Sequence, residues 1–136
     1  MKRKELKISY IGDSERRGFL YHEYEMFVGG ESVGECFLKE GSESRIMTLG
    51  NVGYYVNEEH RGNSYAASAI GELARVAPRY NIDRLVICCK ADNTASARSC
   101  EKAGARFDSV IELTENDDSL AYGTRYVRRY FLDVQK

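Results

Sequence analysis

The stretch NVGYYVNEEHRGNSYAASAIGELARVA, residues 51–77, decides the fold. In its first part Val52, Tyr54 and Val56 alternate with Gly53 and Tyr55, which predicts a strand over 52–56. From Ser64 onward the apolar residues recur at helical spacing, so we expect a helix that Ser64 caps and that ends at about Pro78. The apolar face of this helix consists of Ala66, Ile70, Leu73, Ala74 and Ala77. The stretch therefore predicts a strand, a tight polar turn and a helix.

The turn between this strand and this helix has the features of an anion-binding site. The start of a helix presents unpaired backbone N–H groups and the positive end of the helix dipole. Small residues at Gly62, Ser64 and Ala66 allow a phosphate to approach the backbone closely. Arg61 adds a full positive charge. The turn lacks the Gly-Lys-Ser/Thr of a Walker loop and the spacing of the dinucleotide-binding fingerprint, so we expect an anion cradle of another type.

The part of the chain before this stretch predicts antiparallel strands. Alternating residues indicate strands over 18–28 and 33–39, which a glycine-rich hairpin turn joins. A first strand is expected over 5–11, followed by a polar break over 12–17. Residues 40–45 have the composition of a flexible polar loop. An antiparallel pair over 18–39 is therefore expected to precede the central strand.

The part after this stretch predicts a second strand, a second helix and two final strands. The apolar run over 84–90 is typical of a strand covered on both faces, and it should complete a right-handed parallel crossover. Asn93 or Thr94 is expected to cap the second helix, and Gly104 to end it. The remaining elements are a strand over 106–113, an acidic loop over 114–123 and a strand over 124–134. The sequence thus predicts a single α/β domain over residues 1–136.

The composition restricts the class of protein. A chain of 136 residues with 43% hydrophobic and 11% aromatic content is typical of one globular domain. Twenty basic and 21 acidic residues give a net charge of -1, which argues against a nucleic-acid partner. No run is apolar enough for a membrane span or a signal peptide, so no membrane partner and a cytoplasmic location are expected. The cysteines have no metal-ligand spacing, so no metal is expected; they are Cys36, Cys88, Cys89 and Cys100.

Two segments together resemble the GCN5-related N-acetyltransferase (GNAT) family. Residues 61–66 resemble its Arg/Gln-x-x-Gly-x-Gly/Ala signature. Residues 92–107, DNTASARSCEKAGARF, resemble its Asn-x-x-Ala/Ser-x-x-x-Tyr-Glu-Lys-x-Gly-Phe segment, especially as found in ribosomal-protein acetyltransferases. The two motifs occur in the family's order with a strand between them, over about the second half of the chain. The resemblance implies the acyl-CoA N-acyltransferase fold, a mixed twisted sheet flanked by helices, in which the helices after the first strand are here reduced or absent.

The resemblance also implies that the turn binds the pyrophosphate of acetyl-CoA. Ser64 replaces a family glycine, but a serine is small and keeps its N–H, so the cradle should survive. Asn93 matches the asparagine that binds the pantetheine or phosphate arm, and Arg98 lies one helical turn further on. Each assignment has a structural alternative: residues 61–66 could be an ordinary turn, Asn93 a helix cap and Arg98 a solvated surface arginine. The cofactor-binding residues implied are Tyr55, Val56, Arg61, Gly62, Asn63, Ser64, Tyr65, Ala66, Asn93 and Arg98.

Three residues are candidates for catalysis, and the same resemblance implies two of them, Val56 and Cys100. Val56 matches the strand position whose neighbouring amide polarises the acetyl carbonyl. Cys100 stands where many relatives carry a tyrosine that protonates the departing thiolate; packing is the more common role of such a cysteine, and proton donation is the alternative. The attacking amine also needs a general base, for which Glu25 is a candidate, and Tyr54 or Tyr55 could order a relay water. The alternative bases are Glu23, Glu35, Glu58 and Glu59.

The resemblance implies an enzyme that moves an acetyl group from acetyl-CoA to the primary amine of a small molecule or peptide. The amine would attack directly in a ternary complex. Acidic residues at 112–118 either attract a cationic amine or form a solvated loop; they are Glu112, Glu115, Asp117 and Asp118. A homodimer is expected because the last strand often contributes to dimers in the family. The alternative function is an acyl-CoA-sensing module without turnover, given the missing tyrosine and the reduced acceptor region.

Overall fold

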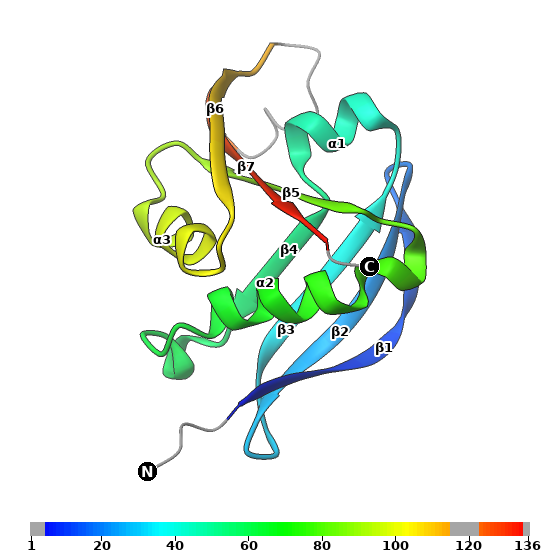
Figure 1. The fold of residues 1–136 in the computed structure, drawn as a ribbon, viewed down its shortest axis with the longest axis vertical. Helices are drawn as coiled ribbons and strands as arrows, with labels where there is room; N and C mark the ends of the chain where they lie inside the picture. The colour runs from blue at the N-terminus through cyan, green and yellow to red at the C-terminus, as the bar shows by residue number, and fades with distance from the viewer. Residues whose placement is uncertain (1–4, 115–122, 135–136) are drawn as a thin grey trace.

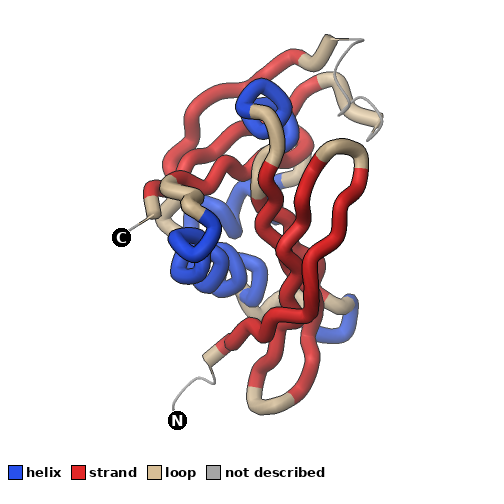
Figure 2. Tube along the Cα trace, turned by 90° about the vertical axis from the view of Figure 1, so that its right-hand side faces the viewer, coloured by secondary structure: helices blue, strands red, loops and turns tan. Residues whose placement is uncertain are grey.

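Two antiparallel sheets form the body of the protein, and Figures 1 and 2 show them as two separate groups of strands. The structure is a computed structural model that describes residues 5–114 and 123–134. The first sheet has the strand order β1-β2-β3-β4, and the second has the order β5-β7-β6. The strands are β1 (Leu6–Arg16), β2 (Phe19–Val28), β3 (Glu31–Glu40), β4 (Val52–Val56), β5 (Arg84–Lys90), β6 (Arg106–Glu112) and β7 (Tyr126–Asp133). The helices are α1 (Glu43–Leu49), α2 (Tyr65–Val76) and α3 (Thr94–Lys102), with short 3-10 turns at Glu58–His60 and Ala77–Tyr80.

The first two strands form one long hairpin, so the predicted polar break over 12–17 is wrong. Strand β1 runs on to Arg16 after a bulge between Tyr10 and Gly12, and the chain turns back at residues 17–18. The polar composition hid this strand because pairing with β2, and not an apolar alternation, holds it in place. No helix lies between β1 and β2, which agrees with the expectation that the family's helices after the first strand are reduced or absent in this chain.

The second hairpin confirms the prediction from its glycines. Val28 pairs with Glu31, so Gly29 and Gly30 alone make the turn. Their φ angles are 58° and 82°, which is the combination that a two-residue turn of this kind requires and that glycine adopts without strain. The turn therefore sets the register of β2 against β3 as far as Phe27, and an irregularity between Phe27 and Met26 shifts it beyond that point.

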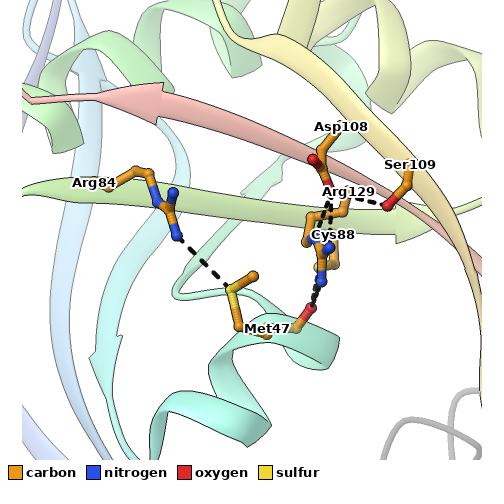
Figure 3. Close-up of polar contacts among 6 residues, drawn as sticks. All are labelled: Met47, Arg84, Cys88, Asp108, Ser109 and Arg129. Carbon is orange, nitrogen blue, oxygen red and sulfur yellow. Dashed lines mark hydrogen bonds and ion pairs between the residues drawn. The ribbon is translucent and has the colours of Figure 1, made fainter.

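Helix α1 occupies part of a segment for which a flexible loop was predicted, at residues 40–45. No apolar stripe announces this helix, and tertiary contacts hold it on the second sheet. The carbonyl oxygen of Met47 accepts a hydrogen bond from Nη1 of Arg129 on β7 at 3.0 Å (Figure 3). Arg129 in turn pairs with Asp108 on β6 at 2.7 Å. The other residues of this cluster in Figure 3 are Arg84, Cys88 and Ser109.

Helix α2 packs on one face of the first sheet and supplies much of the core. Its buried residues are Ala69, Ile70, Leu73 and Val76, whereas the predicted face residues Ala66 and Ala74 are half-buried. The helix ends at Val76, and Pro78 opens the 3-10 turn that follows, as its fixed φ allows. Packing of α2 against β1, β3 and β4 leaves the opposite face of this sheet without a comparable helix among the described residues.

The remaining boundaries agree with the sequence. Asn93 caps α3, because its side-chain oxygen accepts from the N–H of Ser96 at 3.0 Å. Gly104 follows the helix with φ 88°, the left-handed conformation expected there. The predicted strands over 84–90, 106–113 and 124–134 correspond to β5, β6 and β7. Most of the predicted acidic loop, residues 115–122, lies outside the described residues.

Candidate active site

The strands β4 and β5 meet at Asn51 and separate beyond it. The backbone N–H of Asn51 donates to the carbonyl of Val86 at 2.8 Å, and its side-chain oxygen accepts from the Val86 N–H at 2.8 Å. Its Nδ2 also donates to the carbonyl of Arg84 at 3.1 Å. Gly50 just before it has φ 79°, and a Cβ there would lie 2.8 Å from the Val86 oxygen. Because pairing goes no further, the two strands of the expected crossover lie in separate sheets and a cleft opens between them.

Strand β4 presents free backbone groups to this cleft. The N–H of Asn57 donates to β3 at 2.8 Å, and the carbonyl of Asn51 accepts from β3 at 2.8 Å. Successive residues of a strand direct their backbone groups to opposite sides, so the N–H groups of Tyr54 and Val56 point away from β3. The carbonyl of Val56 accepts from Nε of Arg61 at 2.9 Å. The Val56 N–H therefore faces the cleft beside an anchored arginine.

Strand β5 forms the opposite wall in the same way. Val86 directs its N–H and carbonyl toward β4, so by alternation those of Cys88 and Lys90 face the cleft. The cleft has a volume of about 910 Å³, within the range of pockets that hold a cofactor or a drug-sized ligand. Two strand edges without a partner strand among the described residues can hydrogen-bond an extended ligand between them. The cleft thus suits a narrow chain that carries amide groups.

An anion cradle lies at one end of the cleft, where α2 begins. Ser64 is the N-cap residue, as predicted, but it is left-handed, with φ 63°, and its side chain makes no capping hydrogen bond in the described structure. Its hydroxyl instead accepts from Nζ of Lys102 at 2.7 Å. The N–H groups of Tyr65 and Ala66, in the first turn, have no acceptor within the helix. These donors, together with the charges of Lys102 and Arg61, suit a phosphate group.

Most of the predicted cofactor-binding residues line this cleft; they are Tyr55, Val56, Arg61, Gly62, Ser64, Tyr65, Ala66, Asn93 and Arg98. Asn63 is not among the lining residues, and its Nδ2 donates to the carbonyl of His60 at 3.0 Å. Lys102 and Ser96 line the cleft although the sequence interpretation did not name them. The spacing of Arg98 and Lys102, four residues apart on one helix, was the signal that could have identified Lys102.

Cys100 and Glu25, both named for catalysis, lie outside the cleft lining. Cys100 is fully buried behind the wall, where burial raises the pKa of its thiol to about 12. The hydroxyl of Tyr54 lies 2.6 Å from Oγ of Ser96 and therefore bridges β4 and α3 inside the cleft. Burial raises the pKa of Tyr54 above its usual value, so its hydroxyl stays protonated. Tyr54, and not Cys100, is thus the protonated group that lines the cleft.

The face of the first sheet opposite α2 carries a row of polar residues across three strands. Glu25 on β2 pairs with Glu35 on β3, and Glu35 pairs with Tyr55 on β4. Glu35 is exposed and next to the cleft strand, whereas Glu25 lies one strand further away and accepts from the hydroxyl of Ser32 at 2.6 Å. Of the predicted acidic residues at 112–118, only Glu112 is described, on β6. Glu35 is therefore nearer than Glu25 to an amine at the cleft.

Two further findings concern metals and membranes. Among residues 5–114 and 123–134, no group of three His, Cys, Asp or Glu side chains is placed to hold a metal ion. No helix in that same part of the chain is long and apolar enough to cross a membrane.

Solved structures share this fold. RimL, a ribosomal L7/L12 alpha-N-protein acetyltransferase in complex with coenzyme A, is 22% identical with a TM-score of 0.62, over 84% of this chain and 62% of that one. MccE, a microcin C7 self-immunity acetyltransferase in complex with acetyl-CoA and AMP, is 16% identical with a TM-score of 0.63, over 84% and 61%. A Salmonella typhimurium acetyl transferase that modifies the N-terminal serine of L7/L12 is 22% identical with a TM-score of 0.62, over 85% and 64%. The chain thus spans a little under two thirds of the length of these structures.

The comparison with family models is more specific than these structural matches. No curated protein matches the chain. A family model described as an acetyltransferase (GNAT) domain matches residues 2–106, which include the first sheet, the cradle and α3. The second motif therefore lies almost wholly within the matched region. The protein belongs to the GNAT acetyltransferase family.

Proposed function

We propose that the protein transfers the acetyl group of acetyl-CoA to a primary amine by direct attack in a ternary complex. One observation carries this proposal: the edges of β4 and β5 that have no partner strand among the described residues lead to the start of α2, which has no side-chain cap and lies beside positively charged residues. Acetyl-CoA combines an amide-containing arm with a pyrophosphate, and its thioester supplies an activated acyl group. The strand edges suit the arm and the cradle suits the pyrophosphate.

Each part of the cleft has a role in this proposal. Arg61, Arg98 and Lys102 hold the phosphates, together with the first N–H groups of α2. The N–H of Val56 stabilises negative charge on the acyl oxygen, because it is a fixed donor at the edge of the cleft. The hydroxyl of Tyr54, which lines the cleft, donates a proton to the departing sulfur, whereas Cys100 lies outside the cleft lining.

The amine approaches from the face of the first sheet that α2 leaves open. Glu35 is the base on that face, and it accepts the proton of the amine through a water molecule. The direct turn between β1 and β2 leaves the approach wide, so the acceptor is either a small amine or the amine of a peptide. The cytoplasmic location and the homodimer stay predictions from the sequence.

The experiment that tests this proposal is calorimetric titration with acetyl-CoA and with free CoA. Wild type should bind both, and Arg61→Ala should weaken binding by about tenfold or more, because it removes a charge-assisted contact. Arg75→Ala is the matched control, since Arg75 is an exposed arginine of α2 that pairs with Glu72. Failure of wild type to bind acetyl-CoA would overturn the proposal.

A second step separates transfer from sensing. Acetyl-CoA and a panel of primary amines are incubated with the protein, and release of free CoA thiol is followed. Amine-dependent release above the uncatalysed rate supports the transferase. Binding of acetyl-CoA without release for any amine would instead favour the acyl-CoA-sensing module.

A further inference from the structure

A second pocket is lined by residues of β1, β2, β3, the turn between β1 and β2, and α1. Figure 1 shows the strands and the helix that contribute these residues. Its volume is about 260 Å³, below the ~300–1,000 Å³ that usually holds a drug-sized ligand. None of the residues that line it lines the β4–β5 cleft. The pocket is thus a separate site, large enough for one small chemical group. The residues used below are Arg16, Arg17, Phe19, Tyr21, Lys39 and Arg45.

Lys39 is the unusual residue of this pocket. It is only 5% exposed, although lysine is rarely buried without an acidic partner. Among the described residues its ammonium has no hydrogen bond or ion pair, and it lies 4.5 Å from the ring centre of Phe19 and 5.8 Å from that of Tyr21. Burial lowers the pKa of Lys39 to about 8; the nearby Cys88 opposes this shift, and Arg45 and Arg16 add to it. The fold therefore retains a buried cation that no carboxylate of the described chain neutralises.

Arginines add further positive charge around Lys39. Arg16 lies over the ring of Tyr21 at 3.9 Å and Arg45 over the ring of Phe19 at 4.1 Å. Nη1 of Arg45 also donates to the carbonyl of Arg17 at 2.6 Å, which ties α1 to the turn. The cations are thus held in place before any ligand binds.

The acidic residues near this pocket in the described part of the chain, Glu15, Glu23 and Glu40, have other neighbours. Glu23 pairs with Arg16 at 3.1 Å, and the side chain of Arg16 remains 51% exposed. Glu40 lies 2.6 Å from Nε2 of the buried His22, on the face of the sheet that α2 covers. Glu15 lines only the neighbouring depression on the far side of the turn. None of these carboxylates contacts the ammonium of Lys39.

We propose that this pocket binds an oxyanion, the phosphate or carboxylate group of a small molecule, with Lys39 as its central ligand. A buried ammonium gains most from a partner that it can reach by charge-assisted hydrogen bonds. Guanidinium groups at the rim add planar donors that suit the same oxygens. The aromatic rings exclude water from one side of the site and strengthen these contacts. This inference does not depend on acetyl transfer, because it uses no residue of the cleft.

The test is titration with inorganic phosphate, followed by the NMR signals of the lysine side chains. The Arg61→Ala background is used, because it weakens any phosphate binding in the cradle. Addition of phosphate should raise the pKa of Lys39 by about one unit or more. An unchanged Lys39 titration at saturating phosphate would overturn the proposal.

Variants measure the contribution of the buried charge. Lys39→Met keeps a side chain of similar length and should weaken phosphate binding at least tenfold. Lys7→Met is the matched control, since Lys7 is exposed near the start of β1, and it should leave the affinity unchanged. Arg16→Gln alters only the rim and should weaken phosphate binding several-fold. It is the variant to use if Lys39→Met proves unstable. Equal affinity for wild type, Lys39→Met and Arg16→Gln would reject the site.

The source of the anion is distinguished with two amines. Ethanolamine and O-phosphoethanolamine are compared as acceptors, and the comparison is repeated with Lys39→Met. A lower KM for the phosphorylated amine that is lost in the variant would show that the acceptor carries the anion. Equal KM values, together with phosphate binding at Lys39, would show that the anion is a separate small molecule. Absence of any acetylation would count against the proposed transferase and leave the NMR test of the pocket intact.

Discussion

The β4–β5 cleft and the pocket around Lys39 both gather positive charge, but they are built in different ways. The cleft uses backbone N–H groups and exposed cations, and its cradle comes from six consecutive residues, 61–66. The pocket uses side chains that three strands, a turn and a helix bring together around one buried lysine. A site made mainly of backbone tolerates changes of side chain, whereas a site made of packed side chains depends on each of them.

The two sites also differ in what holds them open. Asn51 closes the inner end of the cleft by pairing with β5, so the separation of the strands is a property of the sheets themselves. In the pocket, Arg45 ties α1 to the β1–β2 turn, so the space depends on a short helix held by tertiary contacts. We therefore expect the cleft to survive substitutions at its rim better than the pocket does.

The largest effect should come from Glu35→Gln, which removes the proposed base without altering either anion site. Loss of general base catalysis should lower kcat by about 100-fold. The affinity for acetyl-CoA should not change, because Glu35 lies on the sheet face and does not line the cleft. Steady-state kinetics and calorimetry measure the two quantities. Glu25→Gln is the matched control, and a loss as large as that of Glu35→Gln would show that the proton leaves by another route.

The next effect concerns Asn51→Ala, which breaks the meeting point of the two sheets. The variant loses the side-chain hydrogen bonds to the Val86 N–H and the Arg84 carbonyl, and it leaves these backbone groups unpaired. We expect the free energy of unfolding in urea to fall by about 2–3 kcal/mol. Asn63→Ala, at an exposed position, should cost less than about 1 kcal/mol. Equal losses in both variants would mean that Asn51 does not fix the cleft.

The sequence allowed the cleft to be predicted because its parts are local. The strand 52–56, the cradle and the Asn93 cap each depend on neighbours within a few residues, and all three were found where expected. The family resemblance then placed them in one site. At Cys100 the sequence left packing and proton donation open and favoured packing, and the full burial of the side chain agrees with packing.

The pocket could not be predicted, for a physical reason. Residues 12–17 lack an apolar alternation, so neither the extension of β1 nor the turn that carries Arg17 was visible. Helix α1 forms in a segment with no apolar stripe, because contacts to β5 and β7 stabilise it. Lys39 stands in an alternating strand where a lysine normally faces water. Only the assembled fold buries it between the rings of Phe19 and Tyr21.

A smaller effect is expected from Tyr54→Phe, which tests the donor in the cleft wall. The phenylalanine keeps the ring and removes the hydroxyl that contacts Ser96. We expect kcat to fall by about tenfold, since water can supply the proton less efficiently than a positioned donor. Ser96→Ala is the control, because it removes the partner and leaves the Tyr54 hydroxyl in place. A fall for Ser96→Ala that equals that for Tyr54→Phe would assign the effect to wall structure and not to proton donation.

The smallest effect is a pH dependence of stability that belongs to the pocket alone. The pKa of Lys39 is about 8 in the folded protein against 10.5 for an unburied lysine. Between these values the unfolded chain binds more protons than the folded one, so stability due to this residue rises with pH. Below pH 8 both states are protonated, and the cost of burying the charge is fully present.

This pH dependence is measured as the difference in unfolding free energy between wild type and Lys39→Met. We expect the difference to shift in favour of wild type by about 1 kcal/mol or more from pH 7.5 to pH 10. A difference that stays constant over this range would mean that the ammonium is already neutralised. Phosphate should reduce the shift, because a bound anion compensates the charge that the fold leaves buried.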